Sequence, residues 1–207
     1  MSRVDRSKLP VPGPPRPFAF PRLTRVALAN GLNLRVITHA SVPVAAAVLL
    51  LPGGSSADAA SQAGLASLAA DLLDEGSRGQ SALEISDRIA RMGGDLDLEV
   101  SHDATVISLA MLDRFIDDGL SLVHEICTSP NLAESDFARI RQLRLERLRQ
   151  LRDHPGALAD RAFAQLLYQS HPYAQPNHGT AASMGSLTAE DVRRYHASMF
   201  QPAGATG

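Results

Sequence analysis

The chain is poor in cysteine and in aromatic residues. It contains one cysteine, Cys127, which excludes an intrachain disulfide and a cysteine-rich metal site. That cysteine lies in an apolar helical pattern, so we expect a buried and unreactive thiol.

Tryptophan is absent and aromatic residues make up 4% of the chain, which leaves few rings for stacking on nucleic-acid bases.

A strong net charge and a membrane-spanning segment are also missing. The formal net charge of −2 gives no general attraction to nucleic acid or to an anionic membrane. The longest apolar run, residues 42–51, is interrupted by Pro43 and is too short to cross a bilayer. The first fifteen residues have no apolar core, so no secretory signal is visible. We therefore expect a cytoplasmic protein by default, or a periplasmic one if the true start lies upstream of Met1.

Arginine is concentrated in residues 138–152, which carry six of them. We interpret this segment as a solvated helix whose arginines pair with acidic neighbours. Binding to RNA is the alternative, and the salt dependence of binding tests it. The shortage of aromatic residues favours the first interpretation, so we expect no nucleic-acid and no membrane partner.

The sequence divides into a short arm and one domain. Residues 1–21 contain prolines that oppose both helix and sheet pairing, at positions 10, 12, 14, 15, 17 and 21. Residues 22–207 are predicted to form the folded domain. It opens with two strands, 24–29 and 32–38, around the hairpin signal Asn30-Gly31. A third strand, 44–51, is apolar enough to be buried on both faces.

Further along, helical and strand patterns alternate in groups. Ser81 and Glu84 form a capping box that opens a helix ending at Gly93-Gly94. Strict alternation over residues 95–101 predicts a strand with one solvated face, and a second strand follows at 105–112. The remaining predicted helices span residues 64–75, 113–127, 134–152, 160–169 and 188–199. This order predicts an α+β fold with an antiparallel-rich sheet covered by helices.

The helix predicted over residues 64–75 is amphipathic. Its apolar stripe consists of residues spaced at i, i+3, i+4, i+7 and i+8, namely Leu65, Leu68, Ala69, Leu72 and Leu73. The opposite face carries Ser67, Asp71 and Asp74, and Gly76 suits the left-handed position that ends a helix.

The text around this helix resembles a known family. Pro52-Gly-Gly-Ser-Ser-Ala-Asp58 followed by Ala63-Gly-Leu-Ala66 is similar to the segment that leads into the metal helix of the pitrilysin/insulinase zinc peptidases, which carry an inverted His-x-x-Glu-His motif. Asp153-His154-Pro155, His171-Pro172-Tyr173 and Gly179-Thr180 also occur in the family's order. The resemblance implies an insulinase or mitochondrial-processing-peptidase-like domain. In that family, halves pair into clamshells that enclose extended peptides.

The zinc-binding residues of that motif are absent. The resemblance places Ser67, Ala70 and Asp71 at the positions of the histidine, glutamate and second histidine, and makes Glu146 the nearest candidate for the remote carboxylate. Ser67 is a poor zinc ligand, Ala70 cannot act as a base, and Asp71 with Glu146 gives at most two oxygen ligands. We therefore expect no catalytic residue, no metal site and no cofactor.

Two functional hypotheses follow from the missing motif. The first is a non-catalytic homologue that helps to form a peptide-binding chamber with an active zinc-peptidase subunit or fused half. The alternative is a residual zinc-dependent metalloendopeptidase that uses Asp71, Glu146 and a histidine brought in by the fold. Metal content and peptide hydrolysis by the chain alone distinguish the two.

The resemblance also implies that the chain is a fragment. It stops at residues 201–207, where relatives begin a closing apolar strand and then a second domain. A sheet without its last strand has an unpaired edge, so we expect the isolated chain to be marginally stable or to aggregate.

The other candidate residues do not form a convincing site. The seven histidines are scattered, and His171 and His178, which share one loop, are expected to structure that loop. His102-Asp103 suggests a serine-hydrolase triad, but the chain has no Gly-x-Ser-x-Gly elbow, so we do not expect one.

Overall fold

The computed structural model describes residues 13–15, 17–39 and 41–207. Most of the predicted proline-rich arm therefore lies outside the described residues. The described part of that arm contains no helix or strand and is exposed to solvent. The folded part begins with the first strand.

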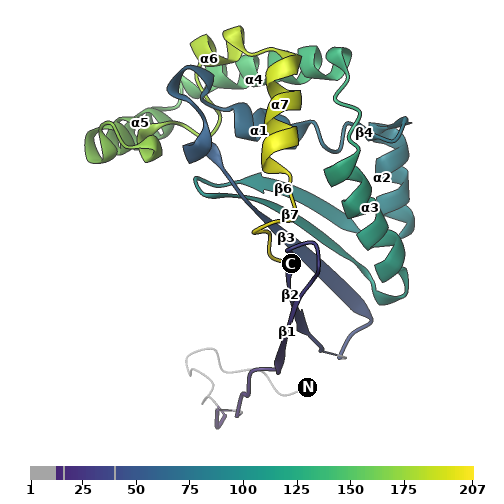
Figure 1. Ribbon diagram of the computed structural model, residues 1–207. Helices are drawn as coiled ribbons and strands as arrows, with labels where there is room; N and C mark the ends of the chain where they lie inside the picture. The colour runs from purple at the N-terminus through teal and green to yellow at the C-terminus, as the bar shows by residue number, and fades with distance from the viewer. Residues whose placement is uncertain (1–12, 16, 40) are drawn as a thin grey trace, which may run out of the picture.

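The strands form one main sheet region and one small hairpin (Figure 1). In chain order they are β1 (Leu23–Ala27), β2 (Asn33–Ile37), β3 (Val44–Pro52), β4 (Gly76–Ser77), β5 (Gln80–Ser81), β6 (Asp95–Val100) and β7 (Ala104–Leu112). β1 pairs with β2, and β3, β7 and β6 are neighbours in that order, with every pairing antiparallel. The small hairpin pairs β4 with β5. The predicted Asn30-Gly31 hairpin is confirmed, and Gly31 has a φ of 91°.

The last residues described join the two groups of strands. Thr206 exchanges backbone hydrogen bonds with Leu50 of β3, at 2.7 and 2.9 Å. On the other side, the Asn33 amide donates to the Ala205 carbonyl and the Gly207 amide donates to the Asn33 carbonyl, both at 3.0 Å. Residues 205–207 thus lie between β2 and β3 and hold the β1–β2 hairpin against the rest of the sheet.

The helices cover one face and one end of this sheet (Figure 1). They are α1 (Leu65–Asp71), α2 (Ala82–Arg91), α3 (Ile116–Thr128), α4 (Glu134–Leu151), α5 (Pro155–Tyr168), α6 (Ala181–Ser186) and α7 (Ala189–Met199). The predicted capping box at Ser81 and Glu84 begins α2. The predicted α+β class with helices on an antiparallel sheet is confirmed.

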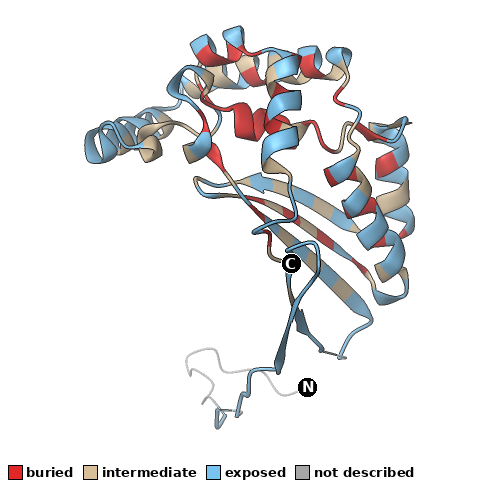
Figure 2. Ribbon diagram, viewed as in Figure 1, coloured by how far each residue is buried: buried red, intermediate tan, exposed pale blue. Residues whose placement is uncertain are grey.

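Two hydrophobic clusters divide the interior. One lies between the sheet and helices α2 and α3 and includes Ile107 and Leu109 of β7. The other surrounds α1 and is closed by α4, α6 and α7. Figure 2 shows α1 as a buried element, whereas α5 projects from the body and has no buried residue.

The prediction for the helix at 64–75 is wrong in two respects. Helix α1 ends at Asp71, and Gly76 begins strand β4 instead of capping the helix. The helix is not amphipathic in the fold, because every residue from 65 to 70 is buried, including Ser67 at 5% exposure. The second cluster covers the side that was expected to face water.

Two further predictions need correction. Strand β3 alternates between faces and buries only Leu51, so it is not buried on both sides. Its other face leaves Val44, Val48 and Leu50 exposed. Helix α5 begins at Pro155, five residues before the predicted start, because proline is favoured in the first turn.

Candidate functional site

The site is built around the start of α1, where two chain segments cross closely. Gly64 precedes the helix with a φ of 90°, a conformation that favours glycine. A β-carbon at this position would lie 2.7 Å from the Gly179 nitrogen, so only glycine allows the 178–180 segment to approach. This crossing places the residue before Gly179, His178, beside α1.

A buried carboxylate fixes the beginning of the helix. Asp58 accepts hydrogen bonds from the Gly64 amide at 2.9 Å and the Ala66 amide at 3.1 Å. Asp58 therefore accepts hydrogen bonds from backbone amides at the start of the helix, as the side chain of a serine or threonine N-cap usually does. Burial raises the pKa of Asp58 to about 6, against the opposite effect of these amide donors.

The three positions that the resemblance assigns to the motif lie on α1. Ser67 and Ala70 are buried, and Asp71 is partly exposed at the end of the helix. The Arg144 guanidinium from α4 forms an ion pair with Asp71 and a hydrogen bond with Nδ1 of His178. The Ser67 hydroxyl lies 3.3 Å from the same Nδ1 atom. A buried arginine thus connects the motif helix, the 178–180 segment and α4.

The electrostatics of this cluster follow from the donor inventory. A guanidinium carries only donors, so Nδ1 of His178 must accept and its proton resides on Nε2. Partial desolvation of the ring, and then the positive charge of Arg144, lower the pKa of His178 below its usual value. The imidazole of His178 and the carboxylate of Asp71 therefore face one guanidinium.

Glu146 does not join this cluster. Its side chain lies on the exposed face of α4 and accepts a hydrogen bond of 2.9 Å from Gln142. The residue of α4 that points at the motif positions is Arg144, two positions earlier. The candidate remnant carboxylate of Glu146 therefore lies apart from this site, and the cation of Arg144 faces it.

These residues do not fit a zinc ion. Zinc sites of the inverted type use two imidazoles and a carboxylate, with a glutamate beside the bound water. Here one imidazole and one carboxylate are both engaged by Arg144, whose positive charge opposes that of a metal ion. Within residues 13–15, 17–39 and 41–207, no three His, Cys, Asp or Glu side chains are grouped closely enough to hold a metal ion.

Sequence reasoning missed Arg144 and underrated His178. The signal for Arg144 was its place on the apolar stripe of α4, seven residues after buried Phe137 and four before Leu148. An arginine on such a stripe needs a partner inside the fold. His178 had no comparable local signal, because its contact depends on the crossing at Gly64.

A second polar cluster holds the loop that carries His178. The Ser55 hydroxyl donates to Asn177 at 2.6 Å and lies 3.1 Å from Nδ1 of His102. Asp103 accepts from the Tyr173 hydroxyl instead of orienting His102. Ser55 is 1% exposed, so a substrate has no access to it. This arrangement fastens the loop to the 101–103 turn.

The single cysteine is placed as predicted. Cys127 is 8% exposed within the α2–α3 cluster, and burial raises the pKa of its thiol to about 12.

The arginines of α4 behave only partly as predicted. Arg139 pairs with Glu75 and Arg144 with Asp71, whereas in the described part of the chain Arg149 and Arg152 make no ion pair.

Comparisons with known proteins agree with this fold. Residues 35–181 match the family model described as insulinase (peptidase family M16). An uncharacterized zinc protease of Streptomyces coelicolor is 26% identical over 178 residues, covering 86% of this chain and 39% of the relative. The non-peptidase homolog YmxG of Helicobacter pylori is 26% identical over 183 residues, covering 84% and 42%. The chain therefore spans less than half the length of these relatives.

A solved structure has the same architecture. It is described as the peptidase M16 inactive domain from Pseudomonas fluorescens and superimposes with a TM-score of 0.84 at 25% identity. The match covers 89% of this chain and 45% of that one. Separately, no helix in the described residues has the length and apolar character needed to cross a membrane.

Proposed function

We propose, because this chain belongs to the insulinase family (peptidase family M16), that it is a non-catalytic member of the family. Its role is to complete a peptide-holding chamber with an active zinc-peptidase subunit or fused half. The observation that carries the proposal is the Arg144 guanidinium, which stands among the motif positions and pairs with Asp71. A fixed cation at this place disfavours a metal ion and cannot activate water.

The remaining parts of the site lack the means for hydrolysis. Ala70 has no group that takes a proton from water, and the Ser67 hydroxyl is buried against His178. A metalloendopeptidase that used Asp71, Glu146 and a histidine would need both carboxylates at one metal. Only Asp71 is near His178, whereas Glu146 lies on the solvent side of α4.

Two observations support a partner subunit. The chain covers 39% and 42% of two relatives, so those proteins contain a second part of comparable size. Helix α5 also exposes large apolar side chains, with Phe163 at 65% and Leu166 at 79% exposure. Exposed apolar side chains in such a group are typical of an interaction surface.

The test measures metal and activity on the purified 207-residue chain, alone and with an intact active homologue. We expect no stoichiometric zinc by inductively coupled plasma mass spectrometry and no hydrolysis of a quenched fluorescent peptide by the chain alone. We further expect a complex with the homologue and a changed hydrolysis rate in that complex. One tightly bound zinc with chelator-sensitive cleavage by the lone chain would establish the metalloendopeptidase instead.

A designed variant serves as the positive control for zinc binding. Restoring the motif with S67H/A70E/D71H while Arg144 remains should leave zinc binding weak, because the guanidinium stays beside the new imidazoles. Adding R144E removes the cation and places a carboxylate on the same face of α4, so this variant should bind zinc more tightly. Equal zinc affinity of the two variants would contradict the role assigned to Arg144.

A further inference from the structure

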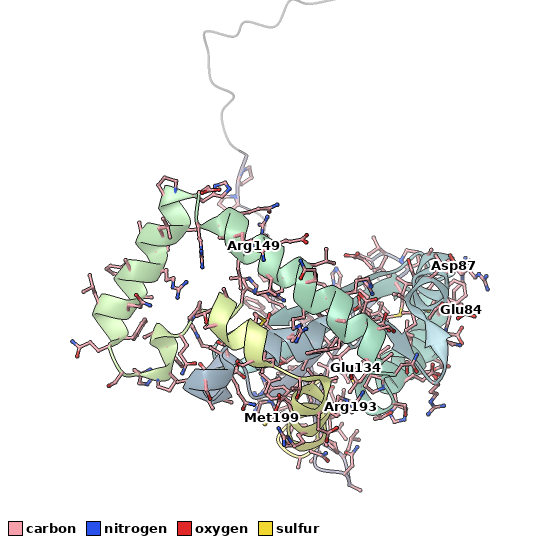
Figure 3. All side chains as sticks on the ribbon, turned by 90° about the horizontal axis from the view of Figure 1, so that it is seen from above. Glu84, Asp87, Glu134, Arg149, Arg193 and Met199 are labelled. Atoms are coloured by element: carbon pink, nitrogen blue, oxygen red, sulfur yellow. The ribbon has the colours of Figure 1, made fainter. Side chains whose placement is uncertain are left out.

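A small apolar cavity lies next to His178, the residue that Arg144 connects to the motif helix α1. It lies between the end of α4, the start of α5 and the loop 176–181, and has a volume of about 160 Å³. Its helical walls are formed mainly by Leu148, Leu151, Ala157 and Leu158, with Arg152 and Arg161 also lining it. Figure 3 shows α4 from above, with Glu134 at its start and Arg149 near the end that approaches α5.

The size of the cavity suits one large apolar side chain. A cavity of about 150 Å³ with aliphatic walls accommodates a benzene ring. The helical part of the wall here is mainly aliphatic, and Leu158 is still 48% exposed. A leucine or phenylalanine side chain entering this cavity would remove that apolar surface from water.

The charges at the cavity are of one sign. Arg152 and Arg161 line it, and no aspartate or glutamate does. Neither arginine makes an ion pair with any residue that the structure describes. Two unpaired guanidinium groups beside an apolar cavity complement a carboxylate attached to an apolar residue, because arginine binds carboxylates through paired donors.

His178 connects this cavity to the motif positions. The residue lines the cavity, while its Nδ1 atom accepts from Arg144. The Nε2 proton has no hydrogen-bond partner among the described residues and is available as a donor. A ligand in the cavity would therefore lie next to the place where the family's zinc motif is altered.

We propose that this cavity binds the carboxyl-terminal residue of a peptide, with a leucine or phenylalanine side chain inside and the α-carboxylate held by Arg152 and Arg161. The inference deepens the proposed function, since it names the class of peptide that the non-catalytic chain holds. The inference rests on the proposed function for the role that it gives to peptide binding. The binding itself is measured on the chain alone and does not depend on that function.

The test is fluorescence anisotropy of the 207-residue chain with a fluorescein-labelled hexapeptide that ends in phenylalanine. The free acid should bind at least about tenfold more tightly than the same peptide amidated at its carboxyl terminus, as expected for a charge-assisted contact. A free-acid peptide ending in glycine should also bind about tenfold more weakly, because it leaves the cavity unfilled.

Arginine variants separate the site from general charge attraction. R152Q and R161Q should each weaken binding of the free acid about tenfold. R149Q is the matched control, because Arg149 is exposed in the last turn of α4, three residues before Arg152, and does not line the cavity. It should change the affinity by less than about twofold. Circular dichroism checks that each variant is folded. We expect all three to fold, because the three arginines are exposed.

Several outcomes would overturn the proposal. They are equal affinity for acid and amide, equal affinity for phenylalanine and glycine, equal effects of R149Q and R152Q, or no binding at millimolar protein. Loss of homologue binding in R152Q without any peptide binding would make the cavity a subunit contact, which also overturns it. None of these results changes the zinc content or hydrolysis on which the proposed function is judged, so the two failures remain distinguishable.

Discussion

Replacing Arg144 by methionine removes the cation between α1 and α4 and keeps an apolar stem of similar length. The Arg144 side chain is 9% exposed and that of Asp71 is 39% exposed, so the pair is only partly shielded from water. Truncating one partner of a fully buried pair costs ~3–5 kcal/mol, whereas an exposed pair contributes ~0–1 kcal/mol. We expect R144M to lower the free energy of unfolding by about 2 kcal/mol, between these limits.

Urea unfolding followed by circular dichroism measures this loss. For a chain of this size about 2 kcal/mol corresponds to roughly 4–8 °C in Tm, so thermal unfolding gives a second readout. R149M is the matched control, because Arg149 is exposed on the same helix and has no ion pair among the described residues. Its effect should stay within about 0.5 kcal/mol.

A double-mutant cycle with D71N tests whether the effect arises from the pair. In the wild type, D71N leaves the guanidinium beside His178 without its counter-charge. In R144M there is no guanidinium to leave unpaired, so D71N should lower the free energy of unfolding by less than it does in the wild type. We expect a coupling free energy of about 1 kcal/mol. Equal losses for R144M and R149M, or strict additivity of R144M and D71N, would refute the idea that Arg144 neutralises Asp71.

Three further predictions concern other parts of the structure. The pKa of His178 is lowered in the folded chain, so below the ordinary value of about 6.5 the unfolded chain binds a proton more readily than the folded chain does. The free energy of unfolding should therefore fall as the pH decreases through this range. H178Q should show a flatter dependence on pH, and identical pH profiles of the two proteins would contradict this. Cys127 should react with a thiol reagent only when urea unfolds the chain, because its thiol is buried with a pKa of about 12; rapid labelling of the native protein would show that the α2–α3 cluster opens. Deletion of residues 205–207 removes the backbone hydrogen bonds to β2 and β3, so hydrogen exchange at Asn33 and Leu50 should accelerate, and unchanged exchange there would argue against this pairing.

The elements that the sequence predicted well have signals within a few residues. Asn30-Gly31 supplies the turn of the first hairpin, and the capping box at Ser81 satisfies amides at the start of α2. Alternation over residues 95–100 matches the exposure pattern of β6. In each case the interacting residues are neighbours in sequence, so the pattern contains the physical cause.

Helix α1 shows where local patterns fail. Its sequence has an apolar stripe and a polar face, which predicts one wet side. The structure buries both sides, because α4, α6 and α7 pack around it. Its early end at Asp71 has a similar origin, since Ser77 beyond it is held by hydrogen bonds to the distant carbonyls of Glu125 and Ser129.

The helix that carries the candidate site was predictable, but the residues that face it were not. Ser67, Ala70 and Asp71 were expected on a helix, and they lie on α1. The family resemblance then suggested Glu146 by counting along the chain, whereas the orientation of α4 presents Arg144 to those positions. A helix turns by about 100° per residue, so two positions separate a buried side chain from a solvated one.

Arg144 cross-links elements of the fold at the place where we propose that the zinc motif is degenerate. A zinc ion bound by residues of two helices connects them, and in this chain the ion pair of Arg144 with Asp71 connects α4 to α1. The bond to His178 adds the loop 176–181 to the same connection. A guanidinium has no acceptor for a proton and no coordination position for a water molecule, so it provides a cross-link without the chemistry of a bound metal ion. Under the proposed function, this site therefore supports folding and peptide holding and supplies no group for hydrolysis.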